Sequence, residues 1–133
     1  MQVVQLPLSV FDQRLLRDGR IAGLRQRGIE VHVRSVFLQG LLLMDPGQVP
    51  VYFAAWREVL RDYRLWLADR CLSPLSAALG FALGLQDADV VFVGVNSAAH
   101  LEEACSAEPL DTDDFGDWAM GDADLLDPSR WRL

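Results

Sequence analysis

The sequence predicts an α/β fold, specifically a partial (β/α) barrel of about three parallel strand–helix units with flanking helices. In residues 29–34, apolar side chains alternate with Glu30, His32 and Arg34, which is the pattern of a strand with one polar face. Strands covered by helices on both faces are usually apolar throughout, so this strand favours a barrel, with Arg34 at its ligand-facing end. The chain has 133 residues, whereas a whole barrel needs roughly 250, so we expect an incomplete TIM barrel.

The composition is that of a folded chain with an acidic end. Hydrophobic residues make up 51% of the chain, which is enough to build a core. Eight of the 19 acidic residues lie in residues 108–133, so we expect a nearly neutral body over residues 1–110 and an acidic tail over residues 111–133. No basic stripe is present to follow a phosphate backbone, so we expect no nucleic-acid partner. All twelve basic residues are arginine, which excludes chemistry based on a lysine of this chain.

The cysteines and apolar runs indicate a cytoplasmic protein. Cys71 and Cys105 stand far apart and outside any metal-ligand spacing, so we expect reduced thiols and no metal site. The chain shows no signal peptide, and its apolar runs are too short to cross a bilayer, so no membrane partner is expected.

The first half of the chain predicts two strands joined by an interrupted helix. Residues 3–8 form the first strand, in which Gln5 is either a structural amide or a ligand-binding group. Asp12 is a candidate cap for the helical region that follows, and Gly19 predicts a break in it. Gly28 ends this region before the central strand.

The middle of the chain predicts two helices after a long loop that ends in the turn Asp45-Pro46-Gly47. Residues 52–70 are strongly amphipathic, and Ser73 with Pro74 starts a second helix. We assign the apolar stripes of both helices to the core: Phe53, Trp56, Leu60, Tyr63, Leu67, Leu75, Ala78, Leu79 and Ala82.

A third strand over residues 90–95 is apolar on both faces and leads through Gly94, Asn96 and Ser97 into a helix over residues 98–107. The free amides at the start of that helix could hold a phosphate, or the segment could be an ordinary strand-to-helix turn. In the acidic tail, Trp118 and Trp131 are expected to dock onto the body.

Four segments together resemble one family. The segments VVQLPLSVFDQR, GIEVHVRSVFLQGLLL, VVFVGVNSAAHLEEA and the DPSRW near the end are similar, in order and spacing, to the C-terminal part of an aldo/keto reductase. The resemblance covers the sixth to eighth barrel strands of that family and nearly the whole chain.

The resemblance implies part of a NADPH site along the barrel rim. In the family, Gln5 would match the residue holding the nicotinamide carboxamide, and Arg34 the residue stacked on the nicotinamide. Ala104 stands where the family has asparagine, and residues 94–107 contain no lysine or arginine, so we expect NADPH to bind weakly or not at all. The other matching positions are Ser35, Phe37 and Gly40 along the pyrophosphate, Gly94, Asn96, Ser97 and His100 around the 2′-phosphate, and Glu103 near the adenine.

The family's catalytic aspartate, tyrosine, lysine and histidine come from the first half of its barrel. Tyr52, Tyr63 and His32 do not match those positions, so we assign no catalytic residue and expect no carbonyl reduction by this chain alone.

Three functions are consistent with these patterns. The first, which we favour, is a non-catalytic protein that self-associates to cover its open sheet edges, with a residual nucleotide or anion site. The second is one half of a split NADPH-dependent reductase that needs an N-terminal partner chain. The third is a nucleotide-binding module. In each, Glu30, His32 and Arg34 form either one buried polar network or a solvated face.

Overall fold

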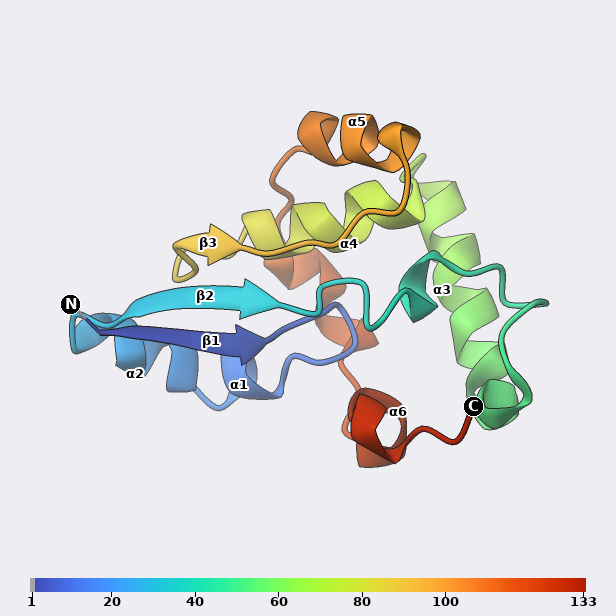
Figure 1. Cartoon of the computed structure of the whole chain (residues 1–133), viewed down its shortest axis with the longest axis horizontal. Helices are drawn as coiled ribbons and strands as arrows, with labels where there is room; N and C mark the ends of the chain where they lie inside the picture. The colour runs from blue at the N-terminus through green and yellow to red at the C-terminus, as the bar shows by residue number, and fades with distance from the viewer. Residues whose placement is uncertain (1) are drawn as a thin grey trace.

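The computed structural model describes residues 2–133 and has an α/β fold (Figure 1). Strands β1 (Val3–Pro7), β2 (Glu30–Arg34) and β3 (Val90–Val91) form one open parallel sheet in the order β1-β2-β3. Within this range, no helix is both long and apolar enough to cross a membrane. The helices are α1 (Arg14–Arg17), α2 (Arg20–Gln26), α3 (Arg57–Asp69), α4 (Pro74–Leu83), α5 (Ala98–Ser106) and α6 (Ala123–Leu126), and the 3-10 helices are η1 (Leu41–Leu43), η2 (Val51–Trp56), η3 (Thr112–Trp118) and η4 (Pro128–Arg130).

The two faces of the sheet differ in the way that the alternation in β2 predicts. Val31 and Val33 are fully buried and belong to the core, together with Ile21 of α2 and the apolar face of α4. In the register, Gln5 of β1 pairs with His32, which in turn pairs with Val90 of β3. Because paired residues of parallel strands share a face, these side chains lie on the opposite, open face of the sheet.

The third strand is shorter and more exposed than the sequence predicts. The ladder includes only Val90 and Val91, although the Phe92 amide still donates to the Val33 carbonyl at 2.8 Å. Beyond this point β2 has ended, and the chain turns away at Ser35 with a φ of +62°, so residues 93–95 have no strand to pair with. Phe92 is 47% exposed, and its ring packs against that of His32 on the open face of the sheet.

The helical region between β1 and β2 is interrupted at Gly19, as predicted, where φ is +77°. The expectation that Asp12 caps the first helix is wrong, since Gln13 occupies the cap position and makes no side-chain cap hydrogen bond. The Asp12 carboxylate instead accepts two hydrogen bonds from the Arg14 guanidinium, at 2.8 and 2.9 Å, because that charged partner is within reach.

The helix predicted over residues 52–70 occurs as η2 followed directly by α3. Its predicted core residues are buried, except Trp56, which is half-buried and donates from Nε1 to Asp122 at 3.1 Å. The start of α4 is as predicted, because Ser73 Oγ accepts from the Ser76 amide at 3.1 Å and Pro74 is the first helical residue. The four predicted core residues of α4 are all buried.

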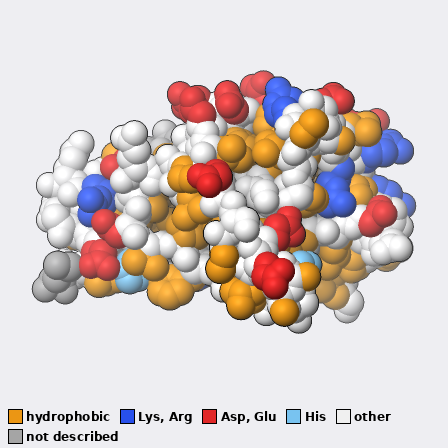
Figure 2. Space-filling view, turned by 90° about the horizontal axis from the view of Figure 1, so that it is seen from above, with side chains coloured by type: hydrophobic (Ala, Val, Ile, Leu, Met, Phe, Trp, Pro, Cys, Tyr) orange, Lys and Arg blue, Asp and Glu red, His pale blue; other side chains and the backbone are white. Residues whose placement is uncertain are grey.

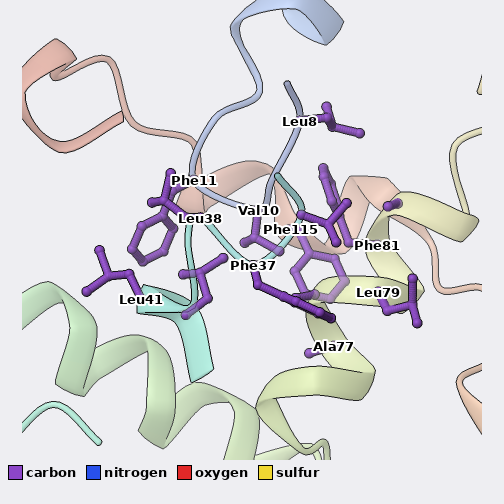
Figure 3. Packing of buried hydrophobic residues seen from close by; sticks show 14 of the residues in the cluster. Leu8, Val10, Phe11, Phe37, Leu38, Leu41, Ala77, Leu79, Phe81 and Phe115 are labelled. Carbon is purple, nitrogen blue, oxygen red and sulfur yellow. The ribbon is translucent and has the colours of Figure 1, made fainter. Parts of the chain in front are cut away.

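Residues 111–133 pack against the rest of the chain through aromatic side chains. Phe115 is 1% exposed and lies beside Phe81 of α4 with the ring centroids 5.4 Å apart (Figure 3). Trp118 packs edge-on against Tyr63 at 5.2 Å, and Trp131 packs against Phe53 at 4.8 Å. The acidic side chains of this segment remain largely on the surface.

Candidate functional site

Two adjoining cavities lie near the carboxyl end of the parallel strands, where ligands of open α/β sheets commonly bind. The first, which we call the β2–β3 cavity, has a volume of about 350 Å³ and lies between the loop after β2 and the segment after β3. The second, the arginine cavity, has about 460 Å³ and lies between the ends of β1 and β2 and the C-terminal residues 123–130. Ser35 and Gln39 line both.

The loop after β2 separates the cavities and has an unusual backbone. Three of its residues have positive φ values: +62° at Ser35, +49° at Leu38 and +55° at Gln39. Residues other than glycine rarely adopt this left-handed backbone conformation. Gly40 follows at +84°. The loop is held by the buried Leu38, whose amide donates to the Ser35 carbonyl at 2.9 Å. Strained positions of this kind cluster at binding sites, and here they direct one loop along both cavities.

The segment after β3 forms the other wall of the β2–β3 cavity through Gly94, Asn96 and His100. Ser97 caps α5, since its Oγ accepts from the His100 amide at 3.1 Å. The Ala98 and Ala99 amides open the helix and have no carbonyl within the helix to donate to. This end of α5 therefore offers hydrogen-bond donors close to the cavity.

The β2–β3 cavity brings together six of the ten residues that the sequence analysis singled out as cofactor contacts. The other four lie elsewhere: Gln5 is exposed on the open face of the sheet, Arg34 lines the arginine cavity, and Ser97 serves as a helix cap. Glu103 accepts a hydrogen bond from Ser73 Oγ and so ties α5 to the start of α4. The six residues that line the β2–β3 cavity are Ser35, Phe37, Gly40, Gly94, Asn96 and His100.

Within residues 2–133, the lining of the β2–β3 cavity includes no lysine or arginine. Its remaining walls are mainly apolar and include Val93 and Leu75, which the sequence analysis assigned to a strand and to the core and not to a binding site. Gln39 was also missed, because its left-handed backbone leaves no recognisable signal in a residue that is not glycine. The cavity combines apolar walls with a few polar groups, an arrangement typical of sites for small organic ligands.

The arginine cavity is assembled from segments that are distant in the sequence. Arg14 comes from α1, Arg34 from the end of β2 and Arg130 from η4. The hydrogen bond to Asp12 raises the pKa of Arg14, and hydrogen bonds from Ser129 lower the pKa of Asp127 beside Arg130. No local motif links these residues, so sequence reasoning identified only Arg34.

The polar side chains of β2 do not form one network. His32 Nε2 lies 2.5 Å from Glu30 Oε1, and the His32 ring packs against Phe92 with the centroids 5.5 Å apart. Arg34 donates to Ser35 Oγ at 3.1 Å instead. The open face therefore carries one polar pair next to an exposed aromatic ring.

Both cysteines are exposed and free. Among residues 2–133, no group of three histidine, cysteine or acidic side chains is arranged to hold a metal ion.

A scan against protein-family models finds no match to this chain, and none of the curated proteins matches it. The similarity to aldo/keto reductases therefore stays an interpretation of the sequence.

Proposed function

We propose that this chain is an aldo/keto reductase-like partial barrel that binds a nucleotide or anion, self-associates and does not catalyse carbonyl reduction alone. The observation that supports it best is the convergence of six residues, chosen from the sequence as cofactor contacts, on the single β2–β3 cavity. These residues come from two segments more than 50 positions apart in the chain.

The β2–β3 cavity suits the adenosine part of NADPH better than the whole molecule. A volume of about 350 Å³ lies at the small end of the range for ligand pockets. Phe37 and Val93 offer apolar walls for a base, while Asn96 and His100 offer polar groups. The first amides of α5 would receive a phosphate. Because no lysine or arginine lines this cavity, we expect modest affinity for a 2′-phosphate.

The tyrosines support the absence of catalysis. Tyr63 is 1% exposed within the core, where burial raises the pKa of its hydroxyl. The Tyr52 hydroxyl donates to the Asp124 carbonyl at 2.7 Å. Neither tyrosine lines either cavity, so neither is placed to protonate a bound carbonyl compound there.

Self-association is supported by the open sheet. Both β1 and β3 are edge strands, and Val3, Val90 and Phe92 are 51%, 36% and 47% exposed. Figure 2 shows hydrophobic side chains among the polar ones across one face of the molecule. An open sheet edge with exposed apolar side chains favours association with another chain. The order of three parallel strands, with helices packed on one face, also fits consecutive units of a barrel, which favours a second candidate: completion by an N-terminal partner chain.

Thermal melts and light scattering, each with and without NADPH, test the proposal. We expect a mass of at least twice 14.9 kDa. At a NADPH concentration one hundred times its Kd, binding should add about 2.7 kcal/mol of stability. Asn96→Leu should abolish most of this gain, whereas Glu102→Gln, at an exposed position of α5, should retain it.

A monomer that is indifferent to NADPH would overturn the proposal. The two candidates differ in their response to a separately expressed N-terminal half of an aldo/keto reductase barrel. Self-association predicts an unchanged mass and no NADPH oxidation with an aldehyde, whereas a split reductase predicts a mixed complex that oxidises NADPH.

A further inference from the structure

The arginine cavity contains one cationic side chain without an acidic partner. Arg14 is paired with Asp12 at 2.8 Å, and Arg130 with Asp124 at 3.1 Å. Arg34 forms no ion pair within residues 2–133, and its one side-chain hydrogen bond goes to the neutral Ser35 hydroxyl. A guanidinium group has five N–H donors in a planar fork that matches a carboxylate. Arg34 therefore has both charge and donors available for an anion.

The rest of the cavity has a mixed lining. Leu8, Leu38 and Leu126 contribute apolar atoms to it, although they are only 1%, 2% and 3% exposed, and Asp12 and Asp127 contribute carboxylates. The volume of about 460 Å³ is large enough for a small organic molecule. One uncompensated arginine matches a single negative charge.

We propose that the arginine cavity binds a small organic monocarboxylate, with its carboxylate on Arg34 and its organic body within the cavity. Arg14 and Arg130 border the site, but each is paired with an acidic side chain, so Arg34 is the group that would hold the carboxylate. The inference does not depend on the proposed nucleotide site, because Arg34 lines the arginine cavity and not the β2–β3 cavity, although Ser35 and Gln39 line both.

Titration calorimetry with benzoate, benzamide and inorganic phosphate tests this site. We expect benzoate to bind, and the neutral isostere benzamide to bind at least tenfold more weakly. Arg34→Gln should weaken benzoate binding at least tenfold, and the fold should persist because Arg34 is exposed. Arg61→Gln, an exposed arginine of α3 outside both cavities, should leave benzoate binding unchanged.

The proposal is overturned if benzoate does not bind the native chain, if Arg34→Gln binds it as tightly, or if inorganic phosphate binds more tightly than benzoate. Benzoate binding without any NADPH binding would refute only the nucleotide proposal. NADPH binding without benzoate binding would refute only the carboxylate site.

Discussion

Gly84→Ala should destabilise the protein, because the end of α4 touches the backbone of the segment that follows α5. A Cβ atom at position 84 would overlap the Leu110 carbonyl oxygen and lie 2.9 Å from the carbonyl carbon, well inside van der Waals contact. Gly80, one turn earlier, is similarly close to the Glu108 carbonyl, at 2.7 Å from a Cβ placed there. The Leu110 amide donates to the Gly80 carbonyl at 2.9 Å, so the two segments are joined at this point.

The expected loss follows from three contributions. Forcing residues 108–110 away from α4 costs about 1 to 3 kcal/mol as an overpacking effect. Losing the Leu110 hydrogen bond costs about 1 kcal/mol more. Replacing glycine by alanine at a helical backbone position returns up to about 1 kcal/mol. The free energy of unfolding should therefore fall by about 1 to 4 kcal/mol.

Urea unfolding measures this change, and α2 provides a matched control. Gly23 lies within α2, where its φ is not positive and a Cβ atom would meet no other atom within 4 Å. Gly23→Ala should therefore raise the free energy of unfolding by about 0.5 to 1 kcal/mol. Both substitutions replace glycine by alanine, but their effects on the free energy of unfolding should have opposite signs. Equal or increased stability in Gly84→Ala would refute the close approach between α4 and Leu110.

Three other substitutions test separate contacts. Tyr63→Phe removes a buried hydroxyl that has no hydrogen-bond partner within residues 2–133, so urea unfolding should show unchanged stability or a gain of up to about 1 kcal/mol; a clear loss would contradict this. Ser73→Ala removes both the cap of α4 and the hydrogen bond to Glu103, so it should cost at least about 1 kcal/mol in the same assay, and an unchanged midpoint would count against both contacts. Ser129→Ala should raise the lowered pKa of Asp127 in an NMR titration, because the Ser129 hydroxyl bonds to that carboxylate; an unmoved pKa would exclude this cause.

Local patterns were sufficient to predict most elements of the fold. The alternation in β2 identified its buried valines, and Gly19 marked the break between α1 and α2. Ser73 with Pro74 located the start of α4, because capping is a property of a few adjacent residues. The third strand was predicted too long, since its length depends on where β2 ends and not on its own apolar residues.

The candidate sites were predictable only in part, for a similar reason. The segments around Ser35 and Asn96 were identified because each follows a recognisable strand. The contributions of Arg14 and Arg130 to the arginine cavity depend on how residues 123–130 pack against the ends of β1 and β2, and no short motif encodes that packing. The left-handed backbone of Leu38 is likewise not signalled by its residue type.

The central claim is that the β2–β3 cavity binds a nucleotide. The most direct test is an NMR titration of the native chain with NADPH that follows backbone amide shifts. We predict saturable shifts at residues 35–40 and 94–100, with α2 unaffected. Shifts confined to other parts of the chain, or no shifts at millimolar NADPH, would contradict the assignment.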